Sequence, residues 1–224
     1  MAHSILDPRS SILNRIRAAR SGRGASSAQE VAQVNAHLAA HPQGPRPYSD
    51  WDPIERLRDR AQSLTTTLER VANMGEVPRA VARYLGENKL PMTAVCWHEF
   101  GELAWQTTDV TVEARPACGD DLVGITGAFC VIAETGTLMM LSGEATPGAT
   151  SLLPETHIAV VHESRIVRGM EDAWALLRAE RGATAMPRAV NFISGPSRTA
   201  DIEQTLVLGA HGPYRVHIIL LRNR

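Results

Sequence analysis

Three short segments of the chain combine polar side chains with glycine or proline in ways that could support chemistry. The first is the turn Ala133–Leu138, which lies between two continuous apolar runs and contains Glu134, Thr135, Gly136 and Thr137. Glycine in such a turn permits a positive φ or a close backbone approach, so the carboxylate and the two hydroxyls could face a ligand above a sheet edge. The alternative is that these groups only tie the turn to its own backbone.

The second segment follows an apolar run that ends at Ser194. Ser197 or Thr199 could cap a helix that we predict from Thr199 to about Leu208, and a helix N-terminus attracts anions through its unpaired N–H groups. Arg198 adds a planar fork that can bind a carboxylate or a phosphate at two points. The segment therefore predicts an anion site.

Acidic side chains in the first turn of that predicted helix offer a different interpretation. Asp201 and Glu203 could neutralise both the helix dipole and Arg198, in which case the loop holds an internal salt bridge and no ligand. The loop has neither the lysine nor the glycine spacing of a Walker loop.

The third segment is Gly209–Pro213, in which two glycines and a proline surround His211. An imidazole there could titrate near neutral pH and act as an acid, a base or a hydrogen-bond donor, with Gly212 beside it. The alternative is a histidine that only shapes the turn before the last strand.

The cysteines predict no metal site. The chain has three of them, Cys96, Cys118 and Cys130, which is an odd number without a C-x-x-C spacing. We therefore expect reduced, mostly buried thiols in a cytoplasmic protein.

The remaining histidines show no spacing that suits metal ligands either. The pair His98–Glu99 lacks the second histidine of an H-E-x-x-H motif. His157 and His162 are five residues apart in an apolar run and would point to opposite faces of a strand.

Composition limits the possible partners. The 224 residues carry a net charge of −1, with acidic and basic residues interspersed, so no basic surface for nucleic acid is expected. No apolar run reaches the roughly 18 residues of a membrane span, and the first twenty residues lack the apolar segment of a secretory signal.

Helical patterns dominate the N-terminal part. Ser27 and Glu30 form a capping-box pattern, and the helix that they open runs toward His41. A proline-rich connector at 43–50 follows. We therefore expect a helical extension at residues 1–48 and an α/β domain at residues 49–224.

The α/β domain is expected to begin with a helix. Asp52 and Pro53 suit its cap and first position, and an apolar stripe with a period near seven residues continues to Val71. This stripe predicts a helix that packs on the core, or alternatively one offered to a partner protein. A further helix is expected at Val77–Asn88.

From Thr93 onward, short apolar runs alternate with turns and helices, which indicates an α/β layer structure. The predicted helix at Met170–Arg181 is stopped by Gly182. Two runs joined only by the tight turn at Glu134 require an antiparallel pair, so we predict an open mixed, mostly parallel sheet flanked by helices. The predicted strands are Thr93–Trp97, Val110–Ala114, Ala128–Ala133, Thr137–Ser142, His157–His162, Val190–Ser194 and Arg215–Leu221.

Several of these segments together resemble the LUD domain, and specifically the lactate-utilisation protein C family. The stretch S-G-P-S-R-T-A-D-I-E followed by G-A-H-G-P is highly specific in combination, and the match covers about Asp120 to Leu221. The segments that carry it are Val123–Thr126, Ile132–Leu138, Leu152–Ile158, Ile193–Glu203 and Leu208–Pro213.

The resemblance implies a fold similar to the sugar-phosphate isomerase and CoA-transferase group. It also implies a place in a three-protein system that oxidises L-lactate to pyruvate, in which the other two proteins carry the iron–sulfur clusters. This chain lacks the cluster cysteines of a larger relative, so we expect no cofactor in it.

Three functions remain open at this point. As a catalytic or accessory subunit of the lactate system, the chain would bind the carboxylate of lactate at Arg198, and His211 or Glu134 would accept the hydroxyl proton. As a stand-alone enzyme of cyclo-ligase or CoA-transferase type, it would use Glu134 as nucleophile or base. As a non-catalytic scaffold, it would bind a small anion and report to partners.

Overall fold

The computed structural model describes residues 8–21, 26–47, 50–182, 185–199 and 207–222. Residues 1–47 and 48–224 form two compact units. The first unit contains helices α1 (Pro8–Ser21) and α2 (Ala28–Ala40). The predicted capping box opens α2: the Glu30 N–H donates to Ser27 Oγ, and the Ser27 N–H donates to the Glu30 carboxylate.

The second unit contains the sheets. Its helices are α3 (Pro53–Ser63), α4 (Val77–Glu87), α5 (His98–Gly101), α6 (Ala149–Leu152) and α7 (Met170–Arg181). Its strands are β1 (Thr67–Val71), β2 (Thr93–Cys96), β3 (Thr111–Ala114), β4 (Val123–Gly127), β5 (Cys130–Ile132), β6 (Thr137–Leu141), β7 (Thr156–His162), β8 (Ile166–Val167), β9 (Val190–Ile193), β10 (Arg198–Thr199), β11 (Val207–Leu208) and β12 (Arg215–Leu221).

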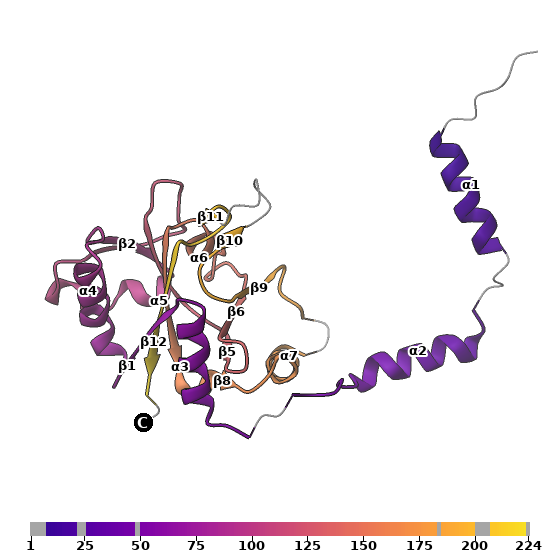
Figure 1. The fold of residues 1–224 in the computed structure, drawn as a ribbon, viewed down its shortest axis with the longest axis horizontal. Helices are drawn as coiled ribbons and strands as arrows, with labels where there is room; N and C mark the ends of the chain where they lie inside the picture. Colours follow the sequence, from indigo (N-terminus) through magenta and orange to yellow (C-terminus); the bar gives the residue numbers. More distant parts are fainter. Residues whose placement is uncertain (1–7, 22–25, 48–49, 183–184, 200–206, 223–224) are drawn as a thin grey trace, which may run out of the picture. The chain divides into compact units, whose positions relative to one another are not determined.

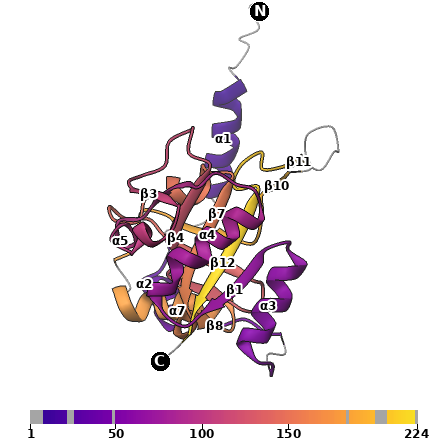
Figure 2. The same cartoon turned by 90° about the vertical axis from the view of Figure 1, so that its left-hand side faces the viewer.

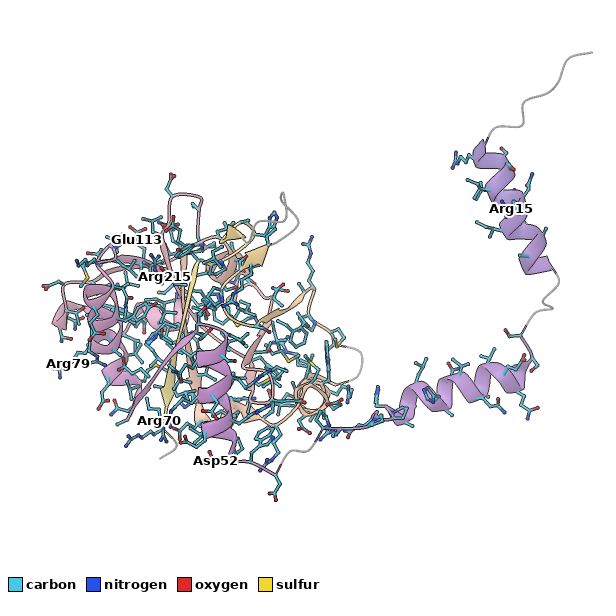
Figure 3. All side chains as sticks on the ribbon, viewed as in Figure 1. Arg15, Asp52, Arg70, Arg79, Glu113 and Arg215 are labelled. Carbon is cyan, nitrogen blue, oxygen red and sulfur yellow. The ribbon has the colours of Figure 1, made fainter. Side chains whose placement is uncertain are left out.

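A six-stranded sheet in the order β1-β12-β7-β4-β2-β3 forms the centre of this unit, and all its strand pairs are parallel. Parallel strands place all their carboxyl ends at one edge. In Figure 3, Arg215 marks the amino-terminal edge at the start of β12, and Arg70, near the end of β1, marks the carboxyl-terminal edge.

A second, four-stranded sheet in the order β8-β5-β6-β9 contains the predicted hairpin. Strands β5 and β6 are antiparallel, as are β6 and β9, whereas β8 pairs with β5 in parallel. The expected α/β fold with mixed pairing is confirmed. The antiparallel pairs lie in this smaller sheet and in a separate two-stranded sheet formed by β10 and β11, whereas the large sheet is wholly parallel.

The two sheets and their helices form layers (Figure 1). On the hairpin, Val131 and Leu138 face the large sheet and join its hydrophobic core. Their neighbours Ile132 and Met139 point the other way, into a second cluster with Leu177 of α7. This alternation follows the two-residue period of a strand. The far face of the large sheet is covered by α4, which lies in front of the strands in Figure 2.

Strand β1 contradicts one prediction. The apolar stripe was expected to remain helical to Val71, but α3 ends at Ser63 and the chain turns at Thr65, whose φ is 61°. The following segment then pairs in parallel with β12, beginning at Thr67 opposite His217. Pairing with a strand 150 positions away overrides the local helical periodicity, and the threonines at 65–67 are poor helix formers.

The prediction of a helix from Thr199 to about Leu208 is also wrong at the two ends that the structure describes, because both ends are in strands. Strands β10 and β11 form an antiparallel pair in which Thr199 lies opposite Val207. A further bond from the Gly209 N–H to the Ser197 carbonyl extends this ladder. The residues between the two strands, which include Asp201, lie outside the described part.

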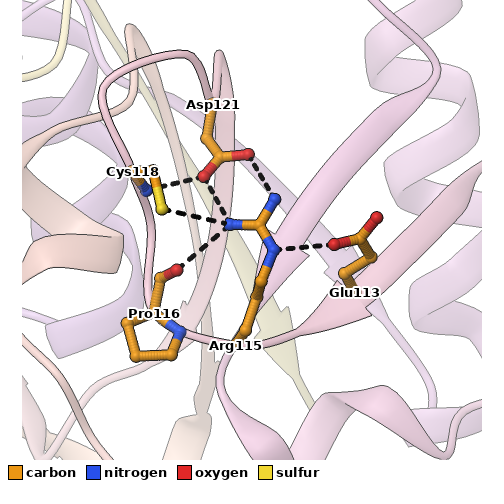
Figure 4. Close-up of polar contacts among 5 residues, drawn as sticks. All are labelled: Glu113, Arg115, Pro116, Cys118 and Asp121. Carbon is orange, nitrogen blue, oxygen red and sulfur yellow. Dashed lines mark hydrogen bonds and ion pairs between the residues drawn. The ribbon is translucent and has the colours of Figure 1, made fainter.

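The loop after β3 is closed by a polar cluster at its base (Figure 4). Arg115 donates from both terminal nitrogens to the carboxylate of Asp121, at 2.7 and 2.8 Å, and its Nε donates to Glu113. The Cys118 N–H donates to the same Asp121 carboxylate. The arginine thereby holds the two ends of the loop together. None of the described helices is long and apolar enough to cross a membrane.

Candidate functional site

Two of the three segments singled out from sequence, the Ala133–Leu138 turn and the loop after Ser194, lie against helix α3 and its C-terminal turn. Gly136 was predicted to supply a positive φ or a close backbone approach, and it shows both: its φ is 70°, and a Cβ there would lie 3.1 Å from Arg60 Cβ. Gly195 has φ of 78°, and a Cβ there would lie 2.9 Å from the Leu64 carbonyl oxygen. Only glycine combines a positive φ with this close approach. Both glycines therefore allow α3 and its C-terminal turn to pack directly on the two loops.

A line of hydroxyls joins the first two predicted segments. Thr135 Oγ1 lies 2.7 Å from Thr137 Oγ1, which lies 2.7 Å from Ser194 Oγ. Thr66 is buried close by, and its Oγ1 has no hydrogen-bond partner among the described residues. The structure thus brings the polar turn and the start of the Ser-Gly-Pro-Ser loop together.

The Glu134 carboxylate is held at the side of this line, near the start of α7. Its backbone N–H donates to the Arg168 carbonyl at 3.0 Å, and its carbonyl accepts from Arg56 at 3.5 Å. A Cβ at Gly169 would lie 3.4 Å from Glu134 Oε2. The half-buried carboxylate therefore faces the N-terminus of α7.

Arg198 does not sit at a helix N-terminus. It lies in β10, and its Nη2 donates to Thr65 Oγ1 at 3.0 Å and to the Leu64 carbonyl at 3.4 Å. These contacts attach the β10–β11 pair to the connection between α3 and β1. The predicted anion site at Arg198 relied on a helix that begins at Thr199, but Thr199 is in a strand.

Ser197 and the Gly209–Pro213 loop are neighbours. The Ser197 N–H donates to the Pro213 carbonyl at 2.9 Å, and a Cβ at Gly212 would lie 3.4 Å from Ser197 Cβ. His211 is exposed, and within the described part no hydrogen bond connects its ring to Glu134 or Arg198. These segments lie at the amino-terminal edge of the large sheet, because β12 begins just after Pro213.

The opposite edge contains a cavity of about 300 Å³, formed where the parallel strands end. Its lining includes Gly127 at the end of β4, His162 at the end of β7 and Leu221 at the end of β12. Open parallel sheets commonly bind ligands outside the carboxyl ends of their strands. We call this space the edge cavity.

An acidic and an imidazole group meet in the edge cavity. Glu99 lies on the short helix α5, and a Cβ at Gly127 would lie 2.8 Å from Glu99 Oε1, so the glycine makes room for the carboxylate. Burial raises the pKa of Glu99, and the charge of His162 opposes that rise. Both side chains line the cavity and are solvent-exposed, so a ligand in the cavity can reach each of them.

Arginines supply the positive charge. Arg165 forms an ion pair with Glu180 at 2.5 Å and lies over the ring of Phe129, 5.6 Å from its centre. Arg181, the last residue of α7, also lines the cavity and has no ion pair or hydrogen bond from its side chain within the described ranges. One of the two guanidinium groups is therefore available to an anion.

Aromatic side chains form part of the wall of the edge cavity, and a hydrogen bond holds one of them in place. Trp97 donates from Nε1 to the Pro147 carbonyl at 3.2 Å, which fixes the indole against the loop after β6. Phe100 and Phe129 provide further apolar surface. A few polar groups within an apolar lining are typical of small-molecule sites.

None of the residues predicted from sequence lines the edge cavity. Glu99 was considered only as half of an incomplete metal motif, and His162 only as a residue on one face of a strand. The signal that could have identified them is their place at the ends of β2 and β7, which requires knowing that these strands are parallel and share a sheet.

Comparison with known proteins assigns the family. Residues 54–221 match the LUD domain. Lactate utilization protein C of Bacillus subtilis is 30% identical over 195 residues, which cover 79% of this chain and 81% of that protein. The protein of the same name from Bacillus licheniformis is 28% identical over the full length of both chains. The one from Halalkalibacterium halodurans is 41% identical over 103 residues, and the aligned part spans 45% of its length.

A solved structure supports the same fold. A DUF162 family protein from Deinococcus radiodurans superposes with a TM-score of 0.54 over 78% of this chain and 99% of that chain, at 24% identity. This likeness concerns the fold, and the family follows from the match over residues 54–221 and from the relatives that align over most of their length. The chain belongs to the LUD domain family.

Proposed function

We propose that the chain is a component of a bacterial L-lactate utilisation system, and that it acts in the cytoplasm with iron–sulfur partner proteins to oxidise L-lactate to pyruvate. The observation that carries this proposal is the relationship to proteins named lactate utilization protein C, at 30% identity over 81% of the Bacillus subtilis protein. The full-length alignment with the Bacillus licheniformis protein supports it.

The proposal divides the chemistry between proteins. Oxidation of lactate to pyruvate releases two electrons and two protons, and the electrons require a redox centre. Iron–sulfur clusters are held by cysteine thiolates. Burial raises the pKa of Cys96 and Cys130, which disfavours the thiolate form that a cluster requires, and the remaining cysteine, Cys118, is exposed. We therefore assign the clusters to the partners and the handling of the small acid to this chain.

Two places could hold the carboxylate of the acid. One is Arg198 with the neighbouring polar groups of the signature segments, as predicted from sequence. The other is Arg181 in the edge cavity. In the first place the guanidinium already donates to Leu64 and Thr65.

The test is a deletion of the gene in its native host, with the genes of the partner proteins left intact. We expect loss of growth on L-lactate as the sole carbon source, unchanged growth on pyruvate, and recovery when the wild-type gene is returned. Growth on pyruvate is the control, because it bypasses lactate oxidation only. Normal growth of the deletion strain on L-lactate would refute the proposal.

A second measurement addresses the partners. The tagged wild-type chain should copurify with proteins whose visible absorbance is that of iron–sulfur clusters, from cells grown on lactate. Recovery of the chain without any such protein, under conditions in which the partners are expressed, would contradict the division of chemistry.

A further inference from the structure

We infer that the edge cavity is a binding site for a small 2-hydroxy or 2-oxo carboxylate, in which Arg181 binds the carboxylate while Glu99 and His162 bind the oxygen on the adjacent carbon. The ligand class follows from the cavity itself. The choice of lactate within that class rests on the function proposed above.

The charge of the site points to one carboxylate. Arg165 is already neutralised by Glu180 and is held over Phe129, so it shapes the wall of the cavity. Arg181 is the remaining arginine in the lining. A single guanidinium binds a carboxylate through two parallel hydrogen bonds, whereas a ligand with several phosphates would need more positive charge than the cavity offers.

The size of the site points to a small molecule. A volume of about 300 Å³ is at the lower end of the range for ligand pockets. The aromatic side chains of Trp97, Phe100 and Phe129 limit this space, and the bond from Trp97 to the Pro147 carbonyl keeps one wall in place. A short carbon skeleton fits such a space better than a nucleotide or a coenzyme.

Glu99 and His162 are the residues that would bind the second functional group of the ligand, the oxygen on the carbon next to its carboxylate. An imidazole beside a carboxyl group can either accept a hydrogen bond from a hydroxyl or donate one to a carbonyl. Gly127 leaves room for the Glu99 carboxylate beside the end of β4, since a Cβ at this position would lie 2.8 Å from Glu99 Oε1. The same two residues can therefore bind the hydroxyl of a 2-hydroxy acid and the carbonyl of a 2-oxo acid.

The binding test is isothermal titration of the purified full-length chain with L-lactate, pyruvate, propionate and inorganic phosphate. We expect L-lactate and pyruvate to bind more tightly than propionate, which lacks the second oxygen, and more tightly than phosphate. Arg181→Gln should weaken L-lactate binding about tenfold or more, because it removes a charge-assisted bond. Glu99→Gln and His162→Gln should reduce the preference for L-lactate over propionate.

Two further variants test whether the effect on L-lactate binding is specific to Arg181. Arg178→Gln removes the same charge from the same helix at a position outside the cavity, and it should bind L-lactate as the wild type does. Arg198→Ala discriminates between the two candidate sites, because loss of L-lactate binding in this folded variant would place the carboxylate at the other edge of the sheet. Circular dichroism and the unfolding midpoint establish that each variant is folded.

Clear results would overturn the inference. It is wrong if none of the four compounds binds the wild-type chain, if folded Arg181→Gln binds L-lactate as the wild type does, or if Arg198→Ala abolishes binding instead. These outcomes are distinct from failure of the proposed function. A deletion strain that grows on L-lactate rejects the pathway but leaves the cavity measurements standing, whereas a growth defect with normal binding by Arg181→Gln rejects only the cavity.

Discussion

His157 lies in the middle of the large sheet, on β7, with none of its surface exposed. Its Nε2 lies 2.8 Å from Thr126 Oγ1, and its Nδ1 is buried without a hydrogen-bond partner among the described residues. Burial lowers the pKa of His157 from 6.5 to about 4. The folded chain therefore keeps this imidazole neutral at a pH where the unfolded chain protonates it.

This difference makes the free energy of unfolding depend on pH. The unfolded chain binds a proton at His157 as the pH falls through about 6.5, whereas the folded chain binds it only near pH 4. The free energy of unfolding is therefore at its full value above pH 6.5 and decreases as the pH falls from 6.5 to 4. For one such histidine the loss amounts to about 2 kcal/mol at pH 5 and to about 3 kcal/mol once both states are protonated.

The assay compares urea unfolding of the wild type and His157→Leu at pH 8 and at pH 5. The variant leaves Thr126 Oγ1 with its bond to the Gly127 carbonyl at 2.9 Å, so it creates no new unpaired group. We expect the difference in unfolding free energy between variant and wild type to shift by about 2 kcal/mol in favour of the variant on going to pH 5. His98→Gln, at an exposed position, should retain the wild-type dependence on pH.

An equal loss of stability in His157→Leu and the wild type between the two pH values would refute this reasoning. Such a result would mean that the imidazole is hydrated or already protonated in the folded chain. His217, whose pKa burial also lowers to about 4, contributes to both proteins alike and cancels in the comparison.

Glycine substitutions provide the remaining predictions, all measured by urea unfolding. Gly124→Ala should destabilise the chain by about 3 kcal/mol or more, because the new Cβ would lie 2.0 Å from the Thr150 carbonyl oxygen in the backbone of α6. Gly86→Ala should stabilise it by about 0.5 kcal/mol, because the added methyl group on α4 meets nothing within 4 Å and restricts the unfolded chain. Gly195→Ala should cost about 2 kcal/mol through its positive φ and its contact with the end of α3, and faster proteolysis near α3 should accompany that loss.

The signature glycines illustrate how a family motif can have a structural role. Gly136 was predicted to supply a positive φ or a close backbone approach, and its φ of 70° confirms the first of these. The reason is that Arg60 and Ala61 of α3 lie directly on it. The segments most characteristic of the family therefore hold the first helix of the domain in place, whatever ligand contacts they also make.

Elements set by local patterns were predictable from the sequence alone. Helix α7 has the predicted bounds Met170–Arg181, and the last strand has the predicted bounds Arg215–Leu221. Capping residues, glycine stops and apolar periodicity act over a few residues, so their effect does not depend on the rest of the fold. The reduced thiols at Cys96 and Cys130 were likewise expected, and both are free and buried.

Strand pairing was decided only by the tertiary structure. The segment from Thr67 continues a helical periodicity, yet it becomes β1 because β12 provides a partner for its backbone. Thr199 follows a helix-capping pattern, yet it pairs with Val207 across a segment of the chain. Hydrogen bonds between distant segments replace those within a helix, and no local pattern records them.

The placement of chemical groups depends on the same long-range pairing. Glu134, Arg198 and His211 could be selected by residue type, but the direction of each strand decides at which edge of the sheet they lie. Glu99, His162 and Arg181 are far apart in the chain and become neighbours because β2 and β7 run parallel and end at one edge, where the end of α7 meets them. Residue types can be read directly from a sequence, whereas a cavity forms only when distant helices and strands pack together in the folded chain.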